Sequence, residues 1–318
     1  MTDIYEKNTV DFKKQLSSEN ITTEYLNSLS GRRFDSVVIA GMGGSGVIGE
    51  ILKDNAESIN LKVPVFVLKD NVLPKTYTKS PLFISVSFSG DTEETLNAFK
   101  SAIRKFGKKN IAAVTGGGKL KEESIKNKTA IASFDRGDLT PRQASGLMYY
   151  GVINILEAIF DVRIPRFELE TIPKLRKAGM DISKKIEGNI IVYSLNNLYH
   201  LSLLWKNNFN ETSKKAAFVN SYPEINHNEI EGFKNISGKW TVIFLDDFGK
   251  FNHKKEFLKK ELKNKKIKSL DIKIPGKNIF EKTWNGIILS HFTSWSLAER
   301  SKENPVEVNT IKRLKKVH

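Results

Sequence analysis

The sequence predicts an α/β fold made of two doubly wound domains in tandem, each with a parallel sheet. Nearly continuous apolar, β-branched runs alternate with segments of helical spacing, as expected for parallel strands buried on both faces. The alternation stops near residue 162 and resumes near residue 188. A chain of 318 residues is long enough for two domains, each with its own core.

The first half reads as a helical arm followed by one such domain. Residues 1–31 are polar and helical in character. Strands are expected at 34–40, 63–68, 82–87, 110–114 and 129–134. Apolar residues recur at spacings of three and four over 92–106, which indicates a helix, and a long helix is expected over 142–160. The first domain is therefore expected to span residues 1–162.

The second half repeats this architecture without repeating the sequence. Residues 161–166 contain a proline that would interrupt a helix, so we interpret them as a linker. Strands are expected at 188–193, 216–219, 240–245 and 267–274, and helices near 197–208, 252–264 and 280–300. The second domain is expected to span residues 163–318.

Composition narrows the class of protein. The absence of cysteine excludes disulfides and thiolate metal sites, and it favours a reducing cytoplasm. The first residues lack the pattern of a secretory leader, and no apolar run approaches the ~20 residues that span a bilayer. We therefore expect a cytoplasmic protein with no membrane attachment.

The chain is strongly basic, with a formal net charge of +15 and a pI near 9.6. Such a charge is compatible with nucleic-acid binding. The lysines are widely spread, however, and the densest group, over 254–266, alternates with apolar residues as an exposed helix face would. We expect a solvated surface that attracts small anions and no nucleic-acid partner.

A glycine-rich loop with the sequence GMGGSG occupies residues 41–46, between a β-branched run and a helix-compatible segment. Its glycines permit positive φ and close approach of an anion to the first N–H groups of a helix. Gly41, Gly43 and Gly46 also match the G-x-G-x-x-G pattern of dinucleotide sites. A phosphate site, a dinucleotide site and a tight turn without ligand all remain open.

A second loop, at 85–95, favours the phosphate interpretation. Ser87, Ser89 and Thr92 offer three hydroxyls beside the start of a helix, a donor set suited to a phosphate monoester. The alternative is a capping box, with Ser89 or Asp91 as N-cap and Glu94 as its partner. A dinucleotide fold does not need this second donor set, whereas a sugar-phosphate site does.

A third stretch offers groups for proton transfer. Glu211 follows an aromatic, amide-rich helical segment, and His227 lies between Asn226 and Asn228. Glutamate and histidine can move protons near neutral pH. The same residues also fit a helix-surface acid and a capping or core histidine. His200, His253 and His291 lack the spacing of a metal site, and the glycines at 116–118 lack the Walker pattern and read as a turn.

The loops at 41–46 and 87–95 together resemble the SIS (sugar isomerase) domain, which has a flavodoxin-like sheet. Over nearly its whole length, the chain resembles the bifunctional phosphoglucose/phosphomannose isomerase family, which has two such domains in tandem. The resemblance implies interconversion of glucose 6-phosphate, and also mannose 6-phosphate, with fructose 6-phosphate through a cis-enediol. It implies no metal and no other cofactor.

The resemblance also implies roles for individual residues. Glu211 would carry the proton between C2 and C1, Arg142 would stabilise the enediolate, and His227 with Lys315 would open the sugar ring. His227 would come from the neighbouring subunit, which makes the protein a homodimer. The phosphate would be bound by the main chain of Gly43 and Gly44 and by the hydroxyls of Ser45, Ser87, Ser89 and Thr92.

Some alternatives stay open at this point. Arg142 also fits an arginine that pairs with an acid at a helix start, and Lys315 lies in a basic C-terminal segment. Tolerance of both C2 epimers is associated in the family with a threonine before the lysine, and either Val308 or Thr310 occupies that neighbourhood. The rival functions are a non-catalytic SIS regulator that binds sugar phosphates and a nucleotide-dependent oxidoreductase.

Overall fold

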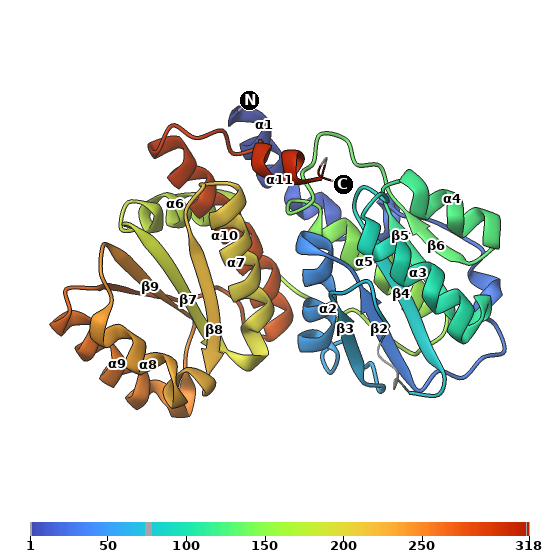
Figure 1. The fold of residues 1–318 in the computed structure, drawn as a ribbon, viewed down its shortest axis with the longest axis horizontal. Helices are drawn as coiled ribbons and strands as arrows, with labels where there is room; N and C mark the ends of the chain where they lie inside the picture. The colour runs from blue at the N-terminus through green and yellow to red at the C-terminus, as the bar shows by residue number, and fades with distance from the viewer. Residues whose placement is uncertain (1, 74–77, 316, 318) are drawn as a thin grey trace. The chain divides into compact units, whose positions relative to one another are not determined.

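Two sheets organise the chain (Figure 1). The computed structural model describes residues 2–73, 78–315 and 317. By its internal contacts the chain divides into two units. The continuous unit is formed by Asp11–Arg166, and the split unit is formed by Met1–Val10 together with Phe167–His318.

The sheet of the continuous unit has the strand order β1-β6-β5-β4-β2-β3. Its strands are β1 (Thr22–Glu24), β2 (Ser36–Ala40), β3 (Val65–Leu68), β4 (Pro81–Ser87), β5 (Ile111–Thr115) and β6 (Ala130–Ser133). Its helices are α2 (Gly43–Asn55), α3 (Glu93–Phe106), α4 (Gly118–Asn127) and α5 (Ser145–Glu157). Helices α3 and α4 pack on one face of the sheet, and α2 and α5 pack together on the other.

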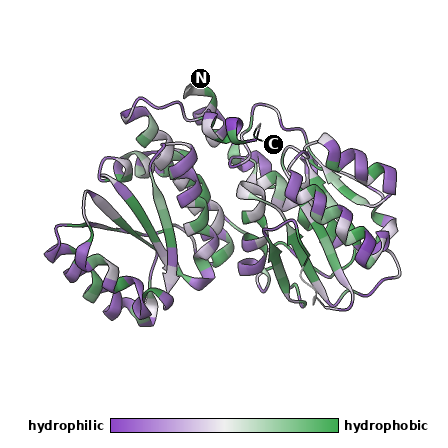
Figure 2. Cartoon of the chain, viewed as in Figure 1, coloured by the Kyte–Doolittle hydropathy of each residue, from purple (hydrophilic) through white to green (hydrophobic). Residues whose placement is uncertain are grey.

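The predicted α/β class and the expected strands of this unit are confirmed. Every residue of β2, β4, β5 and β6 is buried, as their continuous apolar runs predict. Figure 2 shows the same strands as hydrophobic. Two details differ: the short β1 pairs antiparallel with β6, and the helix expected from residue 142 begins at Ser145. The residues just before Ser145 form a turn, in which Gln143 N–H donates to the Thr140 carbonyl (2.9 Å).

The sheet of the split unit is parallel throughout, with the order β10-β9-β7-β8. Its strands are β7 (Asn189–Leu195), β8 (Ala217–Tyr222), β9 (Trp240–Leu245) and β10 (Lys268–Ile272). Its helices are α1 (Thr2–Val10), α6 (Ile172–Ser183), α7 (Tyr199–Glu211), α8 (Glu229–Gly232), α9 (Asn252–Asn264), α10 (Ile279–Arg300) and α11 (Asn309–Leu314). Helix α9 covers one face, whereas α10 packs with α6 and α7. The alternation expected in the second half is confirmed.

The first helix joins the second unit. We expected residues 1–162 to form one domain, but α1 packs within the split unit. Tyr5 is fully buried there, with its hydroxyl 3.1 Å from Thr212 Oγ1 and 2.9 Å from His291 Nδ1. Glu6 accepts a hydrogen bond from Arg176 Nε (2.5 Å). The polar, helical pattern of this stretch does not show in which unit the Tyr5 ring will be buried.

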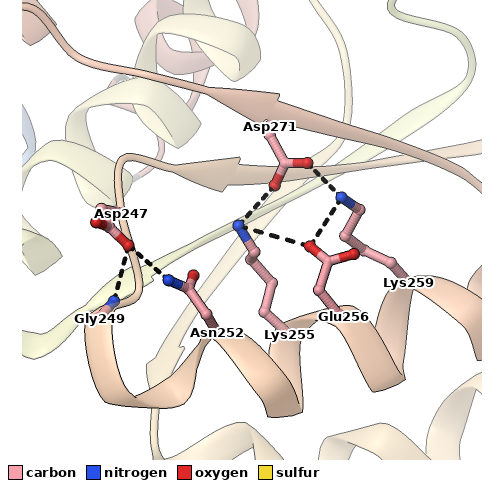
Figure 3. A network of polar contacts seen from close by, with 7 residues as sticks. All are labelled: Asp247, Gly249, Asn252, Lys255, Glu256, Lys259 and Asp271. Atoms are coloured by element: carbon pink, nitrogen blue, oxygen red, sulfur yellow. Dashed lines mark hydrogen bonds and ion pairs between the residues drawn. The ribbon is translucent and has the colours of Figure 1, made fainter.

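Two lysines of the densest basic segment, Lys255 and Lys259, form ion pairs with acidic residues (Figure 3). Lys255 Nζ lies 3.1 Å from Asp271 Oδ1, and Lys259 contacts both Asp271 and Glu256. Burial acts to raise the pKa of Asp271, but hydrogen bonds from Lys259 and Lys255 outweigh it and hold that pKa below its ordinary value. These lysines therefore help to fix α9 against β10, the strand that carries Asp271.

Candidate active site

The glycine-rich loop forms the junction of β2 and α2. Gly43 begins α2 with φ of +52°, and Met42 is the N-cap. A Cβ on Gly46 would lie 2.6 Å from the Gly41 carbonyl oxygen, so the turn closes only with glycine at that position. The first N–H groups of a helix have no partner within the helix. This geometry is compatible with the phosphate site expected from the sequence, which stays a prediction.

The second loop joins β4 to α3, and its hydroxyls are organised by the loop itself. Ser87 Oγ accepts from Gly90 N–H (3.1 Å) and donates to Thr92 Oγ1 (3.2 Å), while Ser89 Oγ accepts from Asp91 N–H (3.2 Å). The N-cap of α3 is Thr92, whose side chain makes no capping hydrogen bond. The capping-box alternative with Ser89 or Asp91 as N-cap is therefore wrong.

The two loops meet at one edge of the sheet. Strands β2 and β4 are parallel neighbours, with Ala40 opposite Ser85. The Ser45 hydroxyl accepts from Phe88 N–H (3.1 Å) and donates to Met148 Sδ (3.4 Å), so it ties the loops together. The strand order reverses between β2 and β4, and ligands of doubly wound sheets bind at such switch points. We call these two loops the cradle.

Arg142 lies next to the cradle and is 3% exposed. It belongs to the turn between β6 and α5, and a Cβ on Gly44 would lie 3.4 Å from Arg142 Cα. The absence of a side chain at Gly44 lets these two main-chain segments approach. The structure therefore brings the main chain of Arg142 against Gly44 in the first loop of the cradle.

The glycines at 116–118, which we expected to form only a turn, also support the cradle. Gly116 N–H donates to the Phe88 carbonyl (3.2 Å), and Lys119 N–H donates to Asp91 Oδ1 (3.1 Å). A Cβ on Gly90 would overlap the carbonyl oxygen of Gly117. The sequence does contain a sign of this role, because residues 116–118 are a third glycine cluster that follows an expected strand. These glycines let the loop at 116–118 lie directly against the second loop.

If the second loop binds a phosphate monoester, as the sequence predicts, replacing Gly90 by Ala should raise the KM for the phosphorylated substrate about 10-fold or more, because the added methyl group displaces that loop from the Gly117 carbonyl. Gly107→Ala is the matched control. Gly90 and Gly107 have φ of +79° and +81°, but a Cβ on Gly107 meets nothing within 4 Å. Steady-state kinetics of both variants test the prediction, and equal KM values would contradict it.

Glu211 is the last residue of α7 in the split unit, and it is partly exposed. It lines a pocket of about 500 Å³. The other lining residues are Asn210, Lys214, Glu303, Asn304, Glu307, Val308, Asn309, Thr310 and Ile311. Both candidates for the epimer-tolerance position thus lie beside Glu211. Lys315 is exposed and immediately follows α11, whose first turn forms part of this wall.

His227 lies at the opposite end of β8 from Glu211. Ala217, the first residue of β8, donates its N–H to Asn210 Oδ1 (2.8 Å), which places the end of α7 at the amino end of the strand. His227 ends the short 3-10 helix that follows the carboxyl end. Six residues of strand span roughly 16 Å. One copy of the chain does not bring Glu211 and His227 together.

His227 lies on the surface of the split unit, beside Asn228. Asn228 donates to Glu224 (2.8 Å), and His227 itself is exposed. Among the residues that the structure describes, no three His, Asp or Glu side chains gather as metal ligands would. The expectation of a metal-free reaction stays a prediction.

Comparison with known proteins identifies the family. A bifunctional phosphoglucose/phosphomannose isomerase from Aquifex aeolicus is 32% identical over 290 residues, which cover 89% of this chain and 90% of that protein. The chain belongs to the bifunctional phosphoglucose/phosphomannose isomerase family. A second isomerase of this name, from Thermoplasma volcanium, is 28% identical over 96% of this chain and 99% of its own length. The resemblance to this family, stated from the sequence over nearly the whole chain, is thereby confirmed.

Two further findings agree with membership of this isomerase family. The family described as bacterial phospho-glucose isomerase C-terminal SIS domain matches residues 176–317. The fold is similar to that of glucosamine-6-phosphate deaminase from Thermotoga maritima, with a TM-score of 0.68 and 14% identity over 95% of this chain and 96% of that one. At this identity the likeness concerns the fold alone. Within the described ranges, no helix is both long and apolar enough to cross a membrane.

Proposed function

We propose that this protein is an aldose–ketose isomerase that interconverts glucose 6-phosphate, and also mannose 6-phosphate, with fructose 6-phosphate through a cis-enediol. The observation that supports it most is the similarity to isomerases of both sugars over 89% of the chain. That length includes most of the continuous unit and of the split unit. The cradle places serine and threonine hydroxyls beside the amino end of α2, which are groups of the kind that bind a phosphate monoester.

In this proposal the phosphate is bound by the cradle. The main chain of Gly43 and Gly44 and the hydroxyls of Ser89 and Thr92 would donate to its oxygens, and Ser87 would do so by turning its single hydrogen from Thr92 Oγ1 to the phosphate. Ser45 would act partly through the hydrogen bond that ties the two loops.

The proton transfer is assigned to Glu211. Its carboxylate removes the proton from C2 of the open-chain aldose, and the C1 carbonyl becomes an enediolate oxygen. The hydroxyl proton on O2 moves to O1, and the protonated carboxyl then delivers its proton to C1 while the C2–O2 bond becomes the carbonyl of the ketose. Arg142 would stabilise the negative oxygen, because a fixed guanidinium acts most strongly where charge develops.

Opening of the sugar ring is assigned to His227 and Lys315, and the enzyme is proposed to be a homodimer. Proton transfer to the ring oxygen and from the anomeric hydroxyl needs an acid and a base. Since His227 and Glu211 lie at opposite ends of β8, the histidine that serves one site would come from the other copy. The two sites of a two-fold dimer would then be completed reciprocally.

A coupled assay tests the proposal. Purified protein is supplied with fructose 6-phosphate, and the formation of glucose 6-phosphate and of mannose 6-phosphate is followed separately. Turnover of both sugars is expected. Binding of fructose 6-phosphate without turnover would favour the non-catalytic regulator, and retention of added NAD would favour the oxidoreductase.

A further inference from the structure

Lys214 lies three residues beyond Glu211 and joins two segments that are distant in sequence. Its ammonium donates to the main-chain oxygens of Glu211 (2.5 Å), Asn304 (2.9 Å) and Glu307 (2.7 Å). An ammonium has three N–H donors, so one cation can serve all three carbonyls. The residue has φ of +55°, in the left-handed region. The Lys214 side chain is exposed, yet its ammonium is hydrogen-bonded to three main-chain carbonyls.

The first of these segments is the end of α7. The last carbonyls of a helix have no partner within the helix and carry the negative end of its dipole, so a cation is favoured there. The Phe209 carbonyl accepts from Ser213 Oγ (2.9 Å) and from Lys215 N–H (3.0 Å). The Lys214 ammonium adds a charge-assisted bond to the carbonyl of Glu211 itself. The main chain at the end of α7, which bears the proposed base Glu211, is therefore fixed by several hydrogen bonds.

The second segment is the turn that precedes α11. Asn304 Oδ1 accepts from Val306 N–H (2.9 Å) and Glu307 N–H (3.4 Å), which gives the turn its shape. Lys214 binds the carbonyls of the first and last residues of this turn. Helix α11 starts two residues later and supplies Thr310 to the pocket wall. The position of α11 relative to Glu211 thus depends on Lys214.

We propose that Lys214 is a positioning residue of the isomerase, which sets the geometry of the Glu211 carboxylate relative to the segment carrying Thr310 and Lys315. This inference rests on the proposed function. A simple helix cap would stabilise α7 without affecting turnover. A positioning residue changes kcat, because proton transfer requires the base and the groups facing it to be correctly placed.

Lys214→Met is the decisive variant, since it keeps the length of the side chain and the left-handed main chain but removes the ammonium. We expect kcat to fall by about 10- to 100-fold, with a smaller change in KM because the cradle is untouched. Lys214→Arg keeps a cation with several donors and should recover part of the loss. Lys215→Met is the matched control, at the neighbouring position, and should leave kcat near that of the wild type.

Hydrogen exchange supplies a readout that does not depend on activity. Amide exchange in the segment 303–315 should be faster in Lys214→Met than in the wild type or in Lys215→Met, because the turn at Asn304–Glu307 loses its anchor. Faster exchange with an unchanged kcat would reduce Lys214 to a cap and overturn the proposal. Unchanged exchange in a well-folded variant would also overturn it.

The two proposals fail differently. A wild-type protein without any isomerase activity would refute the proposed function, and the catalytic part of this inference with it. An active wild type with an equally active Lys214→Met would refute only the positioning assignment. If Lys214→Met does not fold, the kcat and exchange of Lys214→Arg decide in its place.

Discussion

Replacing Glu211 by Gln is expected to lower kcat for both sugar phosphates by about 10²- to 10⁴-fold, the usual contribution of a general base. Glutamine has nearly the same shape as glutamate but cannot accept the proton from C2. KM should change little, because the proposed phosphate donors lie in the cradle. Initial rates in the coupled assay measure the effect.

The loss should be specific to this carboxylate. Glu299→Gln makes the same chemical change at an exposed position near the end of α10 in the same unit, and it should retain wild-type kinetics. A Glu211→Gln enzyme with wild-type kcat would remove Glu211 from the role of base. Isotope exchange adds a check, since the wild type should incorporate solvent deuterium at C2 and Glu211→Gln should not.

Mixing two inactive variants is expected to restore activity if His227 acts across a dimer interface. In a heterodimer of Glu211→Gln with His227→Gln, one site combines both substitutions and the other is fully native. Such a heterodimer should have about half of the wild-type kcat per dimer, far above either parent. Two affinity tags and tandem purification isolate it for assay.

The matched control is a heterodimer of the wild type with the double variant Glu211→Gln, His227→Gln. If the residues act across the interface, each of its sites lacks one group and it should be inactive. If Glu211 and His227 served a site within one chain, the outcomes would reverse: this control would be active and the mixed pair inactive. The two heterodimers therefore decide between the arrangements without a structure of the dimer.

The sheets and the cradle could be predicted because their causes are local. Strands buried on both faces require continuous apolar runs, so β2, β4 and β9 were recognisable from composition alone. The cradle was recognisable because close approach to an anion requires glycine, and hydroxyls beside a helix start are conspicuous. Strand order then brings the two loops together.

Other features depend on long-range packing, which leaves no local signal in the sequence. The three residues of β1 are too few to show a period. The hydroxyl of the buried Tyr5 bonds to Thr212 and His291, which are 207 and 286 residues away in the sequence. Lys214 is one of many lysines, and only the fold supplies the carbonyls of Asn304 and Glu307 that give it a role.

The assignment of α1 to the split unit bears on the order in which the protein folds. The continuous unit is a domain inserted into another, because the residues on both sides of it belong to a single partner unit. During synthesis the cradle unit is complete once Arg166 has left the ribosome, and such units generally fold as they emerge. The unit that contains Glu211 cannot finish folding until α10 has been synthesised, because α10 carries His291, the buried partner of Tyr5. The cradle unit is thus expected to fold before the unit that carries Glu211.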